Sequence, residues 1–183
     1  MGSSKVQIPD GVRDFTGREA YAKREIESKL RNLFRVSGFD EIETPGFEYA
    51  STFTDEIGNV RQENMLRFFD TDGRMLALRP DFTMPAARVV STREKEFPNP
   101  VRVFYIGSAY GFEYNFGLRQ RQFTQAGAEL MGDGCTRSDA EILLLAGQCM
   151  EEIGITDYVL DIGHVGVFTG LVKEAGLNEE QAD

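Results

Sequence analysis

Four polar side chains between residues 119 and 129 are separated by two or four positions, and together they have the chemistry of a pocket for a small charged molecule. If this segment is a β-strand, alternate side chains share one face, because successive side chains of a strand point to opposite sides. The shared face then carries Arg119, Arg121, Gln125 and Glu129. Two guanidinium groups, an amide and a carboxylate suit a zwitterion or a phosphate. The alternative interpretation is a solvated polar face with ordinary ion pairs.

The opposite face of the same segment has the composition of a buried surface. Ala126, Ala128 and Leu130 alternate with the polar set, as contact with a core requires. Phe123 and Gly127 lie among the polar residues, and we expect the glycine to leave a slot on the polar face. The segment therefore predicts a strand with one core face and one candidate binding face.

A second candidate is the run Leu-Arg-Pro-Asp-Phe-Thr at residues 78–83, which places Arg79, Asp81 and Thr83 at a predicted strand-to-helix turn. The free amides and positive dipole end of a helix N-terminus attract a carboxylate. Capping of the helix is therefore one interpretation of Asp81, and ligand binding is the other.

Several common chemistries are disfavoured by what the chain contains. Its single histidine, His164, excludes metal sites that need several histidines, and we interpret it as structural. No Walker or dinucleotide-binding fingerprint occurs, and no serine has a base nearby in the sequence. We therefore expect no metal and no cofactor.

The overall composition is that of a globular cytoplasmic domain. The 183 residues include 20 Lys and Arg against 30 Asp and Glu, and the net charge of −10 gives no general attraction to nucleic acid or anionic lipid. No apolar run approaches the ~20 residues of a membrane span. Cys135 and Cys149 show no disulfide framework, which favours a reducing compartment.

The pattern of elements favours an α+β fold with a mainly antiparallel sheet, in one domain over residues 1–183. Capping boxes at Thr16–Glu19 and Ser138–Glu141 predict the starts of two helices. Gly38 and Gly154 are predicted to close them. The other predicted elements are a strand at 41–44 that Pro45-Gly46 ends, a hairpin at 64–79, a helix opened by Thr83 and Pro85, a buried strand at 101–107, a hairpin at 108–131 with its loop near 113–118, a strand at 158–162 and a helix at 164–175.

Four stretches also carry a family resemblance: Ile-Pro-Asp-Gly-Val-Arg-Asp at 8–14, Glu-Thr-Pro at 43–45, Leu-Arg-Pro-Asp at 78–81 and the run 105–129. They resemble the catalytic core of histidyl-tRNA synthetases and of their paralogue, the regulatory subunit of ATP phosphoribosyltransferase. The resemblance covers nearly the whole chain and includes the first two of the three class II synthetase motifs. It implies a class II synthetase-like antiparallel sheet flanked by helices and a homodimer formed through the Pro45 region. The third motif would lie beyond Asp183, so we expect a domain truncated before it.

The resemblance also implies roles for individual residues. Asp81 and Thr83 match residues that hold the amino group of histidine, although the synthetases have a glutamate, one methylene longer, in place of the aspartate. Gln125 and Glu129 match positions of the histidine pocket. Arg119 and Arg121 match arginines that approach ATP, which makes them candidates for an anion-binding or ATP-like pocket.

Gly111 is the main departure from the synthetase pattern. The synthetases read Phe-Arg-His-Glu where this chain has Tyr-Gly-Phe-Glu at 110–113, so Gly111 replaces an arginine that contacts both the amino-acid carboxylate and the α-phosphate. One preorganised donor of this kind contributes roughly 3–4 kcal/mol to a transition state. The run 160–168 also resembles the regulatory subunit. We therefore assign no catalytic residue.

Three hypotheses follow from the resemblance. The first is a non-catalytic regulatory subunit that is required with the short catalytic subunit of ATP phosphoribosyltransferase for the first step of histidine biosynthesis. Its pocket would serve as a histidine sensor or as a scaffold at the subunit contact. The second is a histidyl-tRNA synthetase that uses ATP and Mg²⁺, and the net charge disfavours its tRNA partner. The third is a degenerate domain with neither role.

Overall fold

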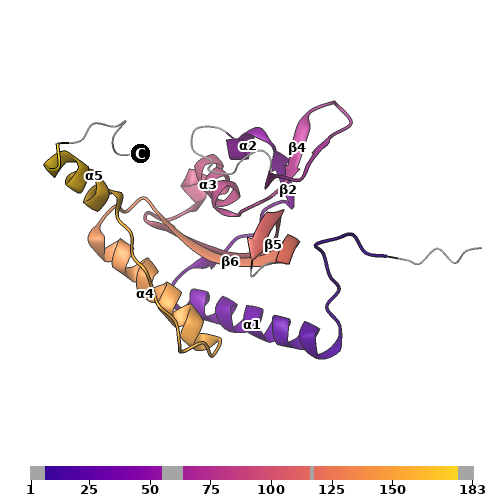
Figure 1. Cartoon of the computed structure of the whole chain (residues 1–183), viewed down its shortest axis with the longest axis horizontal. Coiled ribbons are helices and arrows are strands. Elements are labelled where there is room, and N and C mark those ends of the chain that lie inside the picture. The colour runs from indigo at the N-terminus through magenta and orange to yellow at the C-terminus, as the bar shows by residue number, and fades with distance from the viewer. Residues whose placement is uncertain (1–6, 55–63, 116–117, 177–183) are drawn as a thin grey trace, which may run out of the picture.

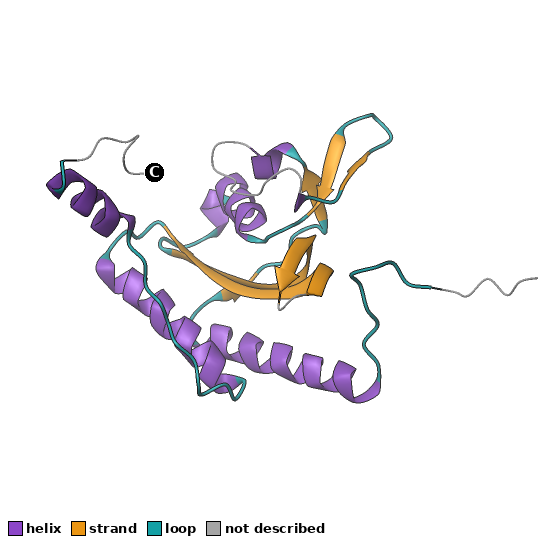
Figure 2. Cartoon of the chain, viewed as in Figure 1, coloured by secondary structure: helices purple, strands orange, loops and turns teal. Residues whose placement is uncertain are grey.

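The computed structural model describes residues 7–54, 64–115 and 118–176, with the backbone alone for residues 54, 112–115 and 118–119. Its strands form two small sheets, and helices lie on both sides of them (Figure 1; Figure 2). The expected α+β class is thus confirmed. The elements are α1 (Gly17–Val36), β1 (Asp40–Glu41), β2 (Phe47–Tyr49), α2 (Ser51–Thr54), β3 (Arg67–Phe69), β4 (Met75–Leu78), α3 (Thr83–Thr92), a 3₁₀ turn (Glu94–Glu96), β5 (Val101–Asn115), β6 (Leu118–Met131), α4 (Thr136–Glu152) and α5 (Val165–Glu174).

The centre of the fold is a long antiparallel ribbon made of β5 and β6. It runs from the pair Val101–Met131 to the pair Asn115–Leu118, with a shift in register between Tyr110 and Glu113. The short strand β1 lies parallel to β5 on its other edge. The predicted hairpin is therefore confirmed, and its first strand is the predicted buried strand extended as far as Asn115.

Helices α1 and α4 cover one face of this ribbon (Figure 1). The buried core between them contains Leu30, Phe34, Phe39, Phe104 and Leu145. Ala128 and Leu130 pack against this core, as the alternation of β6 predicted. Ala126 is the exception, because its side chain is exposed.

The other face of the ribbon meets α3. A second core contains Phe82 and Ala86 with Tyr105 and Ala109 of β5, and Phe123 of β6 packs against it. The polar face predicted for β6 is therefore partly covered by the aromatic side chains of Phe82 and Tyr105, and Phe123 of β6 packs with them. This is the side on which the candidate site lies.

The second sheet has the strand order β2-β4-β3. One of its faces packs on a core of Ala50, Phe53, Met65 and Ala77. The other face carries aromatic residues. Phe47 pairs with Leu78, whereas Tyr49 and Phe68 both pair with Leu76. Directly paired residues share a face of the sheet, so these three rings lie on the same side. The side chains of Phe47, Tyr49 and Phe68 are 51%, 45% and 40% exposed. The predicted hairpin at 64–79 is confirmed as β3 and β4.

Both predicted capping boxes are wrong, although both helices exist. Thr16 is the N-cap of α1 but makes no side-chain cap bond, and Glu19 pairs with Arg13 at 3.2 Å. The Ser138 hydroxyl donates to Asp133 at 2.8 Å, and α4 begins earlier, at Thr136. Glu141 instead accepts a hydrogen bond from Arg102. Glu19, Ser138 and Glu141 therefore bind residues outside the predicted capping boxes.

The helix ends follow the sequence more closely. Gly38 follows α1 with φ of +82°, a conformation that glycine adopts at little cost, and Gly154 and Gly176 follow α4 and α5 in the same way. The Nδ1 atom of His164 accepts the Gly166 amide at 3.0 Å, which caps α5. This histidine therefore has a structural role, as expected.

Three strand predictions need correction. Strand β1 ends at Glu41 rather than Thr44, and β2 at Phe47–Tyr49 follows Pro45-Gly46 where the sequence analysis predicts none. The strand predicted at 158–162 is absent, since no strand of the described chain pairs with it.

Cys135 and Cys149 are free thiols. No helix within the described ranges has both the length and the apolar character to cross a membrane.

Candidate functional site

Tyr105 lies at the centre of the candidate site. Its hydroxyl donates a hydrogen bond to Glu129 Oε1 at 3.0 Å, across the β5–β6 pair. Its ring stacks on that of Phe82, with the centroids 4.5 Å apart and the planes 8° from parallel. The residue is 3% exposed. Tyr105 therefore joins the start of α3 to the polar face of β6.

The slot that Gly127 was expected to leave is not open. Gly127 pairs with Tyr105, and a Cβ atom built at Gly127 would lie 2.5 Å from the phenolic oxygen and 2.6 Å from the adjacent ring carbon. The glycine thus lets the tyrosine ring lie against the strand. The space that the sequence analysis left for a ligand is filled by a side chain of the opposite strand.

The Tyr105 hydroxyl is held in its protonated form by its surroundings. Burial raises the pKa of Tyr105 far above its ordinary value, and the negative charge of Glu129 raises it further. A hydrogen bond between the side chains of Thr83 and Tyr105 acts in the opposite direction and is outweighed. Tyr105 is therefore a permanent hydrogen-bond donor toward Glu129.

Asp81 and Thr83 lie at the N-terminus of α3, beside Tyr105. Asp81 Oδ1 accepts the Thr83 backbone N–H at 2.8 Å, and the Thr83 hydroxyl donates to Asp81 Oδ2 at 3.4 Å. The negative charge of Asp81 also contributes to the raised pKa of Tyr105, which places this carboxylate near the phenol. Asp81 thus accepts the first amide of α3, although the N-cap is Phe82 and makes no side-chain cap bond, and the Asp81 carboxylate remains half-exposed beside the site.

Gln125 lies further along the same face, opposite Gly107. Its side-chain oxygen is buried and has no hydrogen-bond partner. A Cβ atom at Gly107 would lie 2.8 Å from the Phe82 ring, so this glycine admits the ring as Gly127 admits Tyr105. An unsatisfied buried amide oxygen costs free energy, which makes Gln125 a candidate acceptor for a ligand.

The two arginines lie toward the other end of the face. Arg121 is half-buried, and its backbone N–H donates to the carbonyl of Gly11 at 2.7 Å. It is eight residues from Glu129, roughly 27 Å along an extended strand. One small zwitterion is therefore too short to contact both residues. Arg119 belongs to β6, but its side chain lies outside the described residues.

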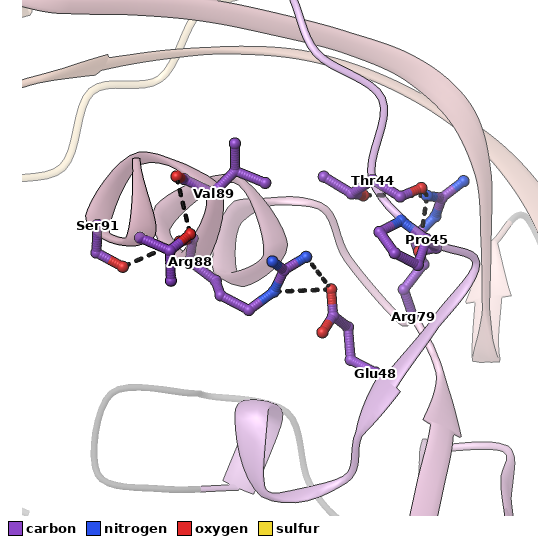
Figure 3. Close-up of polar contacts among 8 residues, drawn as sticks. Thr44, Pro45, Glu48, Arg79, Arg88, Val89 and Ser91 are labelled. Carbon is purple, nitrogen blue, oxygen red and sulfur yellow. Dashed lines mark hydrogen bonds and ion pairs between the residues drawn. The ribbon is translucent and has the colours of Figure 1, made fainter. Parts of the chain in front are cut away.

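Arg79 points into the fold rather than into the pocket. Its guanidinium donates from Nη1 to the carbonyls of Thr44 and Pro45, at 2.6 and 3.1 Å (Figure 3). Its Nε donates to the carbonyl of Ser108 at 2.8 Å. It also lies over the Phe82 ring, 3.8 Å from its centroid. Burial lowers the pKa of Arg79. Arg79 therefore fixes the Pro45 loop, β5 and Phe82 together behind the site.

Gly111 is buried in β5, within the shifted part of the register. A Cβ atom at this position would lie 3.3 Å from the backbone carbonyl oxygen of Asn64. A larger side chain here would require the Asn64 carbonyl to move by a few tenths of an ångström, since few real contacts are tighter. The local packing thus fits glycine.

A large open cavity lies on the opposite side of the ribbon. It has a volume of about 1080 Å³ and is enclosed by α1, the segment 11–15 and the other face of β6. Its wall includes none of Asp81, Thr83, Gln125 and Glu129. Among the described residues, no group of three His, Cys, Asp or Glu side chains could hold a metal ion.

Tyr105 and Phe82 are the site residues that the sequence analysis missed. They carry no charge, and nothing in the spacing of β6 reveals which residue of β5 lies opposite Gly127. The available signal was the pair Gly107 and Gly127 in otherwise regular strands, because a glycine in a strand often marks the close approach of another group.

Comparison with known proteins places this arrangement in context. The family model described as histidyl-tRNA synthetase matches residues 11–183. The ATP phosphoribosyltransferase regulatory subunit of Ruminiclostridium cellulolyticum is 44% identical over 183 residues, and that of Acetivibrio thermocellus is 40% identical over the same length. The match covers 100% of this chain and spans 44% of the length of each relative.

Solved structures agree with these similarities. A crystal structure from Bacillus halodurans, described as an ATP phosphoribosyltransferase regulatory subunit/histidyl-tRNA synthetase, superimposes with a TM-score of 0.87 at 30% identity. It is matched over 100% of this chain and 47% of its own. The apo histidyl-tRNA synthetase of Staphylococcus aureus superimposes with a TM-score of 0.69 at 29% identity, over 82% of this chain and 35% of its own. The expected class II synthetase-like fold is confirmed.

Proposed function

Because this chain belongs to the histidyl-tRNA synthetase family, we propose that it is a non-catalytic regulatory subunit of ATP phosphoribosyltransferase. In this role it assembles with the short catalytic subunit, and the two together perform the first step of histidine biosynthesis. Curated relatives that bear this name and are 40–44% identical along the full chain support the proposal. The role needs no cofactor, whereas the synthetase alternative needs ATP, Mg²⁺ and tRNA.

Gly111 is the observation that carries the non-catalytic part of the proposal. It occupies the position of the arginine that, by the resemblance, contacts the α-phosphate in the synthetases. Its packing against the Asn64 carbonyl supports a backbone adapted to glycine. A glycine offers no side-chain donor to the charge that develops on the phosphate, so adenylate formation loses a major source of stabilisation.

The chain is therefore expected to show no histidine-dependent exchange of pyrophosphate into ATP above the rate without histidine. A working histidyl-tRNA synthetase measured in parallel provides the positive control. Binding of the short catalytic subunit, followed by sedimentation, is the complementary measurement, and a complex is expected. Exchange at the rate of the control enzyme would contradict the proposal and favour the synthetase alternative, which the shared fold supports.

We further propose that the polar face of β6 around Tyr105 binds histidine, as a sensor of the pathway's product. Asp81 and Glu129 are two carboxylates on either side of one phenol, and each can accept a hydrogen bond from a cationic group. Thr83 and the unsatisfied amide oxygen of Gln125 add further partners. Arg121 and Arg119 lie too far along the face to contact the same histidine as Glu129, and they would form a separate anion-binding part of the site.

The Pro45 region is proposed as the contact of a homodimer. Phe47, Tyr49 and Phe68 form an exposed aromatic face next to this loop, and the rings of Phe47 and Phe68 meet edge to face with their centroids 5.9 Å apart. Val36, near the end of α1, is 73% exposed. Exposed aromatic clusters of this kind are typical of protein interfaces.

Phe68→Ser is expected to raise the dissociation constant of this dimer about tenfold or more, because it removes a central aromatic side chain from the contact. Phe69→Ser is the matched control, since the neighbouring side chain lies on the opposite face of β3. Sedimentation equilibrium measures both. A wild-type chain that is only monomeric at concentrations of tens of micromolar would contradict the proposal.

A further inference from the structure

We propose that Tyr105 is the positioning residue of the histidine pocket: its hydroxyl fixes the Glu129 carboxylate in the orientation that receives the ligand's positive charge. The inference rests on the histidine-binding proposal above and adds a residue to it. No charged or polar pattern in the sequence pointed to this tyrosine, and the argument depends on its contacts alone.

The first step concerns the tyrosine ring, which has little freedom to move. Phe82 stacks on one side of it at a centroid distance of 4.5 Å, and the absent side chain of Gly127 makes room for its hydroxyl end. Arg79 in turn lies over Phe82 and is tied to three backbone carbonyls. The position of the Tyr105 oxygen is therefore set by a stack of buried groups, and not by the ligand.

The second step concerns Glu129. Within the described part of the chain, the Tyr105 hydroxyl is the hydrogen-bond donor recorded for this carboxylate, and it contacts Oε1. A glutamate side chain that no other group holds would sample several rotamers, and fixing it when a ligand binds would cost conformational entropy. The tyrosine removes that cost in advance and leaves Oε2 as the acceptor for the ligand.

The third step concerns the chemistry of the donor. The Thr83 side chain and the Asp81 carboxylate both act on the pKa of Tyr105, so the phenol lies between Glu129 and the turn that opens α3. Because the phenol stays protonated, it donates a hydrogen bond to Glu129 Oε1 and brings no charge of its own to the site. A ligand ammonium or imidazolium group can then bind the carboxylate through the oxygen that remains.

The test is a double-mutant cycle on histidine affinity, measured by calorimetry on the full chain. Tyr105→Phe retains the ring that stacks on Phe82 and removes only the hydroxyl. It is expected to weaken histidine binding about five- to tenfold, because the Glu129 side chain must then be ordered when the ligand binds. In the background of Glu129→Ala, the same change is expected to alter affinity less than about twofold, because no carboxylate remains to be positioned.

Tyr158→Phe is the matched control. It removes a hydroxyl that donates to the Gly147 carbonyl at 3.3 Å, on the other side of the ribbon, and should leave affinity unchanged. A purely structural role for Tyr105 would weaken binding equally with and without Glu129, and that result would overturn the inference. Wild-type affinity in Tyr105→Phe would also overturn it while leaving histidine binding intact. A wild-type chain that binds no histidine would instead overturn the histidine-binding proposal itself, and this inference with it.

Discussion

Replacement of Arg79 with alanine is expected to lower the free energy of unfolding by about 3–5 kcal/mol, because three carbonyls of the fold lose a common hydrogen-bond donor. Arg79 is 8% exposed, and its guanidinium donates to the carbonyls of Thr44, Pro45 and Ser108 and to the Thr44 hydroxyl. Without it, a buried hydrogen bond at Thr44 and partly buried ones at Pro45 and Ser108 are lost, and each unsatisfied buried group costs roughly 1–3 kcal/mol. Domains of this size have a total stability of only about 5–15 kcal/mol.

Urea unfolding followed by circular dichroism measures this effect. Arg31→Ala is the matched control, because Arg31 also donates a hydrogen bond from Nε, to Glu41 at 2.9 Å, but on the surface. Exposed ion pairs contribute about 1 kcal/mol or less, so the control should stay near the wild type. If the two variants lost equal stability, the role assigned to Arg79 would be wrong.

Glu129→Ala is expected to weaken histidine binding by about 1.5–3 kcal/mol, which corresponds to roughly ten- to 150-fold. The substitution removes a carboxylate that Tyr105 already orients, so the ligand loses a charge-assisted hydrogen bond to a prepared acceptor. Calorimetric titration with histidine gives the affinity directly. We expect the folded state to persist, since Glu129 is only half-buried and Tyr105 remains stacked on Phe82.

Glu141→Ala is the comparison for this second substitution. Glu141 also carries one hydrogen-bonded carboxylate, but it faces Arg102 on the α4 side of the ribbon. Its removal should leave histidine affinity unchanged. Equal affinity in the wild type and Glu129→Ala would show that this face of β6 is not the binding site.

The sequence predicts the two faces of β6 well and the contents of the site less well. Alternation places Ala128 and Leu130 in the core with α1 and α4, because a strand has a period of two whatever its neighbours are. Alternation says nothing of distance, so Arg121 and Glu129 were grouped although they lie eight residues apart. It also cannot reveal the facing residue of β5, which depends on register, and Tyr105 was missed for this reason.

Local patterns failed where a residue outside the pattern decided the outcome. The side chains of Glu19 and Glu141 were assigned to capping boxes, but Arg13, six residues before Glu19, and Arg102 of β5 bind them instead. The strand β2 exists because β4 pairs with it, and its three residues after Pro45-Gly46 carry no sufficient signal of their own. By the same reasoning, the apolar stretch 158–162 forms no strand, since apolar character alone supplies no neighbour.

The β5–β6 ribbon has a consequence for the order in which the chain folds. Its turn joins Asn115 to Leu118, and no pair within it is further apart in the sequence than Val101 and Met131. Such a hairpin closes a short loop, whereas the contact of α1 with α4 closes a long one at a greater entropic cost. Both cores that flank the ribbon draw residues from it, Phe104 on one side and Tyr105 on the other. We therefore expect the ribbon to form before the helices pack on either side of it. Phe104 and Tyr105, adjacent residues of β5, then each contribute to the core on one face of the ribbon.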